Sequence, residues 1–103
     1  MSTLHTVNKS PFTHTELQSC LVAASEGDSI LLIENGVLAA LAGTPWAEQL
    51  AAAGARGIAL YALQDDLAAR GLSADRCATI TSLLDYAGFV RLSCQHQRIH
   101  SWY

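Results

Sequence analysis

The stretch that most constrains the fold of this chain is residues 27–41, GDSILLIENGVLAAL. Its four apolar residues at 30–33 lie between turn-forming residues, which is typical of a short strand buried on both faces. A polar triplet, Glu34-Asn35-Gly36, then ends the strand, and the run of Ala and Leu after it indicates a covering helix. A buried strand followed by a turn and a helix is half of a parallel α/β unit. Ligands and partners of such sheets meet the carboxyl ends of the strands, so the triplet is expected there.

The remaining apolar runs repeat this alternation of strand and helix. Further strands are expected at 3–7, 57–63 and 77–84, with an edge strand at 99–103. Helices are expected between the strands, and their approximate ranges are 14–25, 37–41, 46–53, 65–70 and 86–95. With right-handed crossovers, this order predicts one three-layer α/β domain over residues 1–103. Its sheet has four or five mainly parallel strands, with helices on both faces.

The first helix has the clearest start signal. Thr13 is the expected N-cap, and Glu16 three residues later completes a capping box. Phe12 and Leu17 fit a hydrophobic staple around that cap. The stripe expected to face the sheet consists of Leu17, Leu21 and Ala24. A second cap is expected at Asp85, before the helix at 86–95.

Charge and hydropathy exclude several classes of function. The formal net charge is −3, and the chain has one lysine and no cluster of basic residues, so nucleic-acid binding is not its main activity. No apolar run approaches the ~20 residues of a membrane-spanning helix. The first ten residues match neither a secretory signal nor a transit peptide, and we expect a cytoplasmic location. Only 15% of residues are charged, against a typical ~25%, so we expect other subunits to cover part of the surface.

The three cysteines are expected to be reduced in the cytoplasm. None belongs to a CxxC pair, which excludes a zinc knuckle and a thioredoxin-type motif. Cys20 lies in the middle of the first helix, at the edge of its apolar stripe, and two interpretations stay open. It is either a small packing residue or a sulfur carrier whose thiol accepts a persulfide, although no cationic neighbour is close in sequence. Cys77 and Cys94 are expected to pack.

The four histidines do not have metal-ligand spacing. His96 and His100 are four residues apart, but the segment around them does not resemble a helix, so no metal site is expected. A Cys–His nucleophile pair formed across the fold stays open, because sequence gives no distances. The phosphate-binding patterns GxGxxG and GxxxxGK[ST] are absent, and no cofactor is expected.

The remaining candidate functional residues are acidic and aromatic. Asp65 and Asp66 are expected in the first turn of a helix, where acidic groups interact favourably with the helix dipole. Aromatic residues are enriched at protein contacts. The candidate interface anchors are therefore Trp46, which could equally belong to the core, Trp102 and Tyr103.

Taken in order, several short blocks resemble the DsrH/TusB family. They are LHTVNKSPF at 4–12, GD at 27–28, LLIENGV at 31–37, YAL at 61–63, DDL at 65–67, ARGL at 69–72, DYAGFV at 85–90 and Trp102. The resemblance covers nearly the whole chain, and the order and spacing of the blocks are more specific than any one of them. It implies a compact DsrE/F-like α/β sandwich.

The resemblance also implies partners. Proteins of this family are the smallest subunits of α2β2γ2 heterohexamers, together with DsrE/TusD-like and DsrF/TusC-like chains. These complexes relay persulfide sulfur to a DsrC/TusE-like carrier, for oxidation of stored sulfur in the Dsr branch and for 2-thiouridine of tRNA in the Tus branch. The principal persulfide cysteine is implied to lie in the DsrE/TusD-like partner. A cysteine corresponding to Cys20 is typical of DsrH-type chains and not of TusB-type chains, which favours DsrH and a role for this thiol.

Two roles are therefore open for this chain. In the first, Cys20 accepts or passes a persulfide in sulfur oxidation. In the second, the chain is a structural subunit that completes the hexamer and shapes the docking surface of the carrier. A stand-alone binder of small molecules has no ligand motif to support it.

Overall fold

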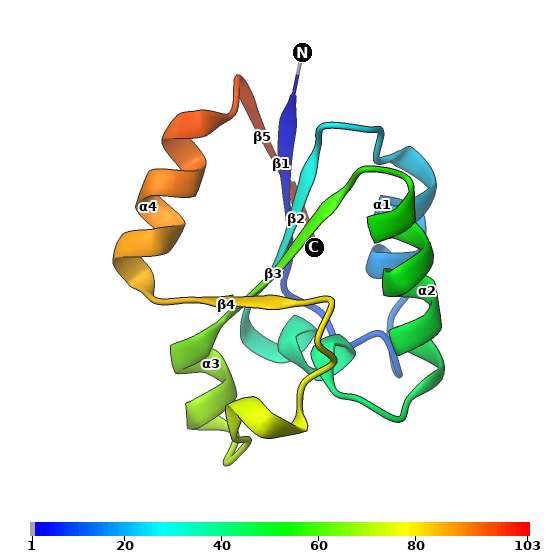
Figure 1. Ribbon diagram of the computed structural model, residues 1–103, viewed down its shortest axis with the longest axis vertical. Coiled ribbons are helices and arrows are strands. Elements are labelled where there is room, and N and C mark those ends of the chain that lie inside the picture. Colours follow the sequence, from blue (N-terminus) through cyan, green and yellow to red (C-terminus); the bar gives the residue numbers. More distant parts are fainter. Residues whose placement is uncertain (1) are drawn as a thin grey trace.

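Five parallel strands form a single sheet in the computed structural model, which describes residues 2–103 (Figure 1). The strands are β1 (Thr3–Val7), β2 (Ser29–Leu32), β3 (Ala59–Leu63), β4 (Ser82–Leu84) and β5 (Arg98–Trp102). Their order across the sheet is β4-β3-β2-β1-β5, and each neighbouring pair is parallel. The described residues thus form one α/β domain, and the predicted fold class is confirmed.

Helices cover both faces of this sheet. On one side lie α1 (Glu16–Ala23) and α2 (Pro45–Ala55), and on the other lies α4 (Tyr86–Gln95), so we call the two sides the α1 face and the α4 face (Figure 1). At the end where β1 to β3 finish lie α3 (Gln64–Ala69) and the 3₁₀ helix η1 (Glu34–Ala40). A short 3₁₀ turn, η2 (Ala74–Arg76), precedes β4. None of the helices in residues 2–103 is long and apolar enough to cross a membrane.

The larger core lies on the α1 face. Alternate residues of the strands point to this face, because successive side chains of a strand project to opposite sides. Ile30 and Leu32 of β2 pack there against the predicted stripe of α1, and both are almost completely buried. The other buried members include Val7, Leu17, Leu21, Ala24, Leu50, Leu60, Ala62 and Leu67.

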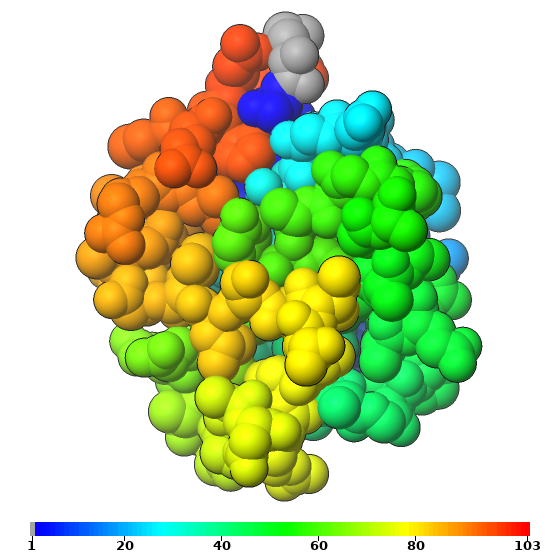
Figure 2. All heavy atoms as spheres, in the orientation of Figure 1, coloured from blue at the N-terminus to red at the C-terminus, as the bar shows by residue number. Residues whose placement is uncertain are grey.

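A smaller core lies on the α4 face. Leu4 of β1, Leu31 of β2 and Leu92 of α4 form its buried centre, with Ile33, Tyr61, Leu84 and Phe89 packed around them. In the space-filling view, α4 (orange) and α2 (green) lie on opposite sides of the molecule, with the loop before β4 (yellow) between them (Figure 2). Together the two cores explain why β2 is buried along its whole length.

The polar triplet after β2 is not a separate turn. It begins η1, so the expected helix at 37–41 belongs to a 3₁₀ helix that starts at Glu34. The Gly36 N–H donates to the Ile33 carbonyl over 2.8 Å, the three-residue bond of this helix type. A Cβ at Gly36 would overlap the carbonyl oxygen of Val7. The sequence therefore places a glycine where η1 passes directly against the end of β1.

The predicted start of the first helix is wrong. The helix begins at Glu16, two residues later than expected, and Thr15 occupies the cap position without a side-chain hydrogen bond. The Ser10 carbonyl accepts from the amides of Thr13 and His14, and the Ser10 hydroxyl accepts from the Phe12 N–H. This serine-centred turn uses the Thr13 amide, one of the two that a capping box would have needed, and local hydrogen bonds of this kind compete with helix formation. Phe12 is 54% exposed, so the hydrophobic staple is absent as well.

Two other boundaries differ from the prediction. The expected strand at 77–84 is reduced to three residues, because the backbone of residues 76–78 pairs with residues 40–42. The Ala42 N–H donates to the Arg76 carbonyl over 2.8 Å, and the Ala78 N–H donates to the Ala40 carbonyl over 2.7 Å. Helix α2 continues through Gly54 instead of stopping there.

Three other local predictions are confirmed. Asp85 caps α4, with its carboxylate accepting from the Gly88 N–H over 2.7 Å. Asp65 and Asp66 lie in the first turn of α3. The expected edge strand pairs with β1, in a register that sets His5 beside His100 and Val7 beside Trp102.

Candidate functional site

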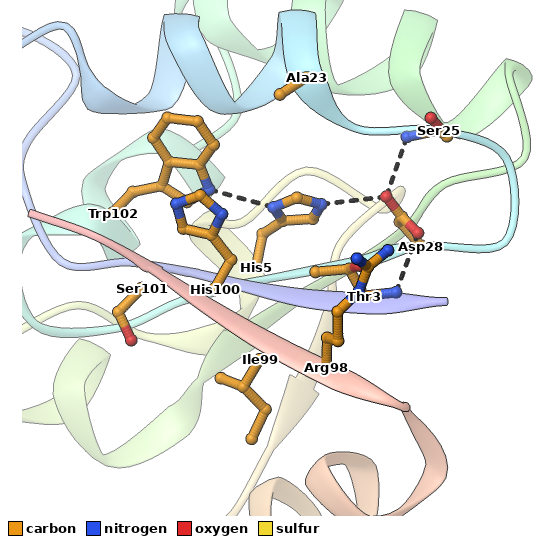
Figure 3. A pocket seen from close by; sticks show the side chains of 10 residues that line it. All are labelled: Thr3, His5, Ala23, Ser25, Asp28, Arg98, Ile99, His100, Ser101 and Trp102. Atoms are coloured by element: carbon orange, nitrogen blue, oxygen red, sulfur yellow. Dashed lines mark hydrogen bonds and ion pairs between the residues drawn. The ribbon is translucent and has the colours of Figure 1, made fainter. Parts of the chain in front are cut away.

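A groove of about 620 Å³ lies on the α1 face, beside β1, β5 and the end of α1. Arg98, His100 and Trp102 project from β5 into the groove, whereas Ile99 and Ser101 point to the opposite side of the strand (Figure 3). The residues that line it are Thr3, His5, Ala23, Ser25, Asp28, Arg98, Ile99, His100, Ser101 and Trp102. The pairing of β5 with β1 therefore builds one wall of the groove.

A chain of hydrogen bonds runs along the floor of the groove. The indole Nε1–H of Trp102 donates to His5 Nδ1 over 3.0 Å, and His5 Nε2 is 3.0 Å from Asp28 Oδ2 (Figure 3). An indole nitrogen can only donate, so His5 Nδ1 carries no proton. His5 is then the neutral tautomer with its proton on Nε2, and it donates that proton to Asp28. This tautomer follows from the donor on Trp102 and needs no other assumption.

Asp28 is held by further donors. The Thr3 N–H donates to Asp28 Oδ1 and the Ser25 N–H donates to Oδ2, both over 3.0 Å. Burial opposes ionisation of this carboxyl group, but the hydrogen bonds from Ser25, His5 and Thr3 outweigh it and hold the pKa of Asp28 below its ordinary value. Asp28 therefore joins the start of β1 and the turn after α1 to the histidine on the groove floor.

The aromatic wall of the groove is a flat stack. The rings of His100 and Trp102 lie 4.3 Å apart between centroids with an interplanar angle of 2°. His5 is tilted against both rings, with centroids 6.0 Å from His100 and 6.2 Å from Trp102. Trp102, predicted as an interface anchor, is thus half-buried and tied to the sheet through His5.

Cys20 lies in the main core and not in the groove lining. Its side chain is completely buried among the residues of the α1 face, at the centre of the helix stripe and not at the predicted edge. Burial raises the pKa of the Cys20 thiol to about 12, and the negative charge of Asp28 adds to the rise. The thiolate that attacks a persulfide is therefore scarce in this conformation of the chain. The role predicted for Cys20 stays a prediction.

The other predicted site residues do not gather around Cys20. Cys94 is exposed on α4, and Cys77 is half-buried, with its pKa raised by burial and by Asp75. His14 Nδ1 is 2.7 Å from the hydroxyl of the neighbouring Thr13, and His96 Nε2 is 2.9 Å from the Ser29 hydroxyl. Within residues 2–103, no three His, Cys, Asp or Glu side chains come together as a possible metal site.

The strand ends that were expected to meet ligands carry a small polar network. The Glu34 N–H donates to Asp66 Oδ2 over 2.7 Å, and Arg70 Nε donates to Asn35 Oδ1 over 2.9 Å. Glu34 has a positive φ of 50°, which is uncommon outside glycine. These hydrogen bonds join η1 to α3, so the triplet is a strand-to-helix connection that polar contacts stabilise.

The two remaining aromatic candidates differ. Trp46 is half-buried and packs against the main core, in agreement with the core interpretation of this residue. Tyr103 is 80% exposed, just after β5. An exposed aromatic side chain at this place fits the predicted role of an interface anchor.

Sequence reasoning missed the partnership of His5, Asp28 and Trp102. Asp28 was noted only as part of a family block, and His5 as part of a strand, of another family block and of a set of histidines without metal-ligand spacing. A signal was present: a histidine on a strand needs a partner when it is buried, and an Asp before a strand is a common acceptor for turn amides. The identity of the partners depends on which strand lies beside β1, and sequence spacing does not give this.

The comparisons with known proteins agree with this fold. The sequence model of a family described as "DsrH like protein" matches residues 9–99. Protein TusB of Escherichia coli (strain K12) is 41% identical over 99 residues, which is 96% of this chain and 99% of that protein. Protein TusB of Serratia proteamaculans is 43% identical over the same shares.

Solved structures show the same architecture. The crystal structure of the ychN protein from E. coli aligns with a TM-score of 0.81 over 99% of this chain and 100% of that chain, at 13% identity. The solution structure of protein Tm0979 from Thermotoga maritima aligns with a TM-score of 0.67 over 90% and 92% of the two chains, at 27% identity. The likeness to the ychN protein concerns the fold alone.

Proposed function

Because this chain belongs to the DsrH-like family, we propose that it is a subunit of a cytoplasmic sulfur-relay complex. The observation that carries the proposal is the similarity to proteins named TusB over almost the whole of both chains. The proposed partners are a DsrE/TusD-like chain and a DsrF/TusC-like chain, in an α2β2γ2 hexamer that exchanges persulfide sulfur with a DsrC/TusE-like carrier. A charged fraction of 15% supports this, since a small domain with few charges is suited to being covered by partners.

The names of the relatives favour the tRNA branch, in which the sulfur ends in 2-thiouridine. A second candidate, oxidation of stored sulfur in a DsrEFH-type complex, is favoured by the presence of Cys20. Deleting the gene for this chain separates them. Loss of 2-thiouridine from tRNA supports the first branch, and normal 2-thiouridine with impaired oxidation of stored sulfur supports the second.

Within the complex, the structure favours a structural role for this chain. Transfer of a persulfide requires an accepting thiolate to attack the outer sulfur of the donor persulfide, while the donor leaves as a thiolate. Cys20 has no exposed surface, and its thiol has a pKa of about 12. Carriage of sulfur by Cys20 requires α1 to move away from the sheet, whereas a supporting role needs no such movement.

Two measurements test the proposal. The first is the native mass of the tagged chain purified from its own cells, with its co-purifying proteins identified. A complex with two DsrE/F-like chains is expected, and a lone monomer would contradict the proposal. The second is sulfur loading of the purified complex in Cys20→Ser, with Cys94→Ser as an exposed control. Equal loading of wild type and Cys20→Ser supports the structural role, and loss of loading with assembly intact supports the relay role.

A further inference from the structure

Strand β5 is an open edge of the sheet. It pairs with β1 on one side, and no strand within residues 2–103 lies on its other side. Four of its five residues are exposed. The outer N–H and C=O groups of such a strand lack sheet partners, and they match the backbone of an extended chain.

The charge around this edge is opposite to that of the whole chain. Residues 86–103 contain two arginines, two histidines and no acidic residue, although the formal net charge of the chain is −3. Within residues 2–103, no Lys or Arg side chain lies within ion-pair distance of a carboxylate, so the guanidinium of Arg98 has no carboxylate partner there. Arg98 lies at the start of β5 and projects into the groove (Figure 3).

Exposed apolar side chains gather in the same part of the chain. Seven large hydrophobic side chains are exposed among the described residues, and four of them belong to α4, to β5 or to the residue just after it. These four are Tyr86, Val90, Ile99 and Tyr103. Ile99 is 55% exposed and Tyr103 is 80% exposed, and both lie at the free edge. Natural edge strands usually carry few exposed apolar residues, so this edge resembles a contact surface.

We propose that the free edge of β5 binds an extended acidic segment of another protein, which adds a sixth strand to the sheet. Side chains of an added strand alternate between the two faces. On the α1 face, a carboxylate of the segment pairs with Arg98. The next side chains of the segment on the same face cover the stack of His100 and Trp102. On the α4 face, an apolar side chain packs against Ile99. The inference rests on the proposed function only in taking the bound protein to be a member of the relay complex.

Other occupants fit this edge less well. A second copy of the chain would bring two acid-free basic segments together, and like charges on neighbouring strands are unfavourable. A nucleic acid cannot use the row of backbone donors and acceptors as an extended polypeptide can. Both alternatives are outcomes of the test below.

The first measurement locates the bound segment. The photoreactive amino acid p-benzoylphenylalanine replaces Tyr103 in the full chain, and cross-linked peptides of the purified complex are identified by mass spectrometry. The same substitution at Phe12, which is 54% exposed in a different loop, is the matched control. We expect position 103 to cross-link to a peptide that contains Asp or Glu, and position 12 not to cross-link to that peptide. A cross-link from position 103 to a second copy of this chain, to a non-acidic peptide or to nucleic acid overturns the proposal.

The second measurement tests the charge pairing. Arg98→Glu is expected to weaken binding of the cross-linked partner by about 10- to 100-fold, the range for losing a hydrogen bond to a charged group. Replacing the partner's carboxylate by Lys should restore binding to Arg98→Glu. Arg91→Glu makes the same change of charge on the exposed side of α4 and should leave affinity within about twofold. Equal effects of the two reversals would contradict a specific pair at the edge.

The third measurement separates this inference from the proposed function. Amide hydrogen exchange is followed in residues 98–102, in the isolated chain and in the complex, and the native mass of each sample is recorded. New sheet hydrogen bonds should slow exchange in β5 by about 10-fold or more. An assembled complex with unchanged exchange in β5 overturns the inference and leaves the proposed function standing. If the chain is purified as a lone monomer but position 103 still cross-links to an acidic peptide, the proposed function is contradicted and the inference stands.

Discussion

The hydrogen bond from Trp102 to His5 ties the edge strand to β1, and Trp102→Phe removes it while keeping an aromatic ring. The bond is 3.0 Å long, and its acceptor belongs to a histidine that is only 4% exposed. Water therefore has little access to replace the lost donor. A buried acceptor left without a partner costs about 1–3 kcal/mol. The smaller ring also loses part of its stack on His100, and such aromatic pairs contribute about 0.5–1.5 kcal/mol.

We expect Trp102→Phe to lower the free energy of unfolding by about 2–3 kcal/mol. Urea unfolding followed by far-ultraviolet circular dichroism measures this value without depending on tryptophan fluorescence. Trp46→Phe is the matched control, because Trp46 is also half-buried but forms no side-chain hydrogen bond within residues 2–103. This control loses ring area alone, and we expect a cost of about 1 kcal/mol.

A double-mutant cycle gives the decisive comparison. His5→Leu removes the acceptor, so Trp102→Phe should cost less in that background, with a coupling of about 1 kcal/mol or more. If Trp102→Phe costs no more than Trp46→Phe and the coupling is below about 0.3 kcal/mol, the hydrogen bond contributes nothing. The neutral tautomer assigned to His5 would then lose its basis.

Other parts of the molecule give predictions that simpler assays check. In thermal melts, Gly36→Ala should destabilise the fold by about 3 kcal/mol because its Cβ overlaps a carbonyl of β1. Gly54→Ala meets only side-chain atoms, chiefly those of Ile80, which can shift, and it should change stability by less than about 1 kcal/mol. The pKa of Asp28 is lowered in the folded chain, so its ionised form stabilises the fold at pH values above the ordinary pKa of an aspartate side chain. Wild type should lose that stability below about pH 4, and urea unfolding at pH 7 and pH 3 should show a smaller difference for Asp28→Asn. Iodoacetamide should label Cys94 in the native chain and spare Cys20, and equal labelling would mean that α1 opens readily.

The layers of the fold were predictable because strong local patterns agree with the final packing. The apolar run of β2 is buried on both faces, and the acid before α4 caps that helix as expected. The start of α1 was not predictable in the same way, because Ser10 and Thr13 offer competing local hydrogen bonds and the sequence does not rank them. The 3₁₀ geometry of η1 depends on the close approach of Gly36 to β1, which is a tertiary contact.

The candidate site was less predictable than the fold. His5, Asp28 and Trp102 come from distant parts of the chain, and their roles depend on β5 returning to lie beside β1. No local pattern distinguishes this arrangement from a fifth strand added after β4. Cys20 was visible as a candidate because of its residue type, but its complete burial depends on how α1 packs on the sheet.

The position of β5 in the sheet also affects folding during translation. Trp102 is 97 positions after His5, and ribosomes add about 5–20 residues per second, so roughly 5–20 s separate the synthesis of the two partners. Throughout that interval one side of β1 has no neighbour, and an unpaired strand in a growing chain is prone to incorrect association. Nascent chains that stall before β5 emerges should therefore be the species that chaperones bind. The groove comes into existence only when translation has passed Trp102.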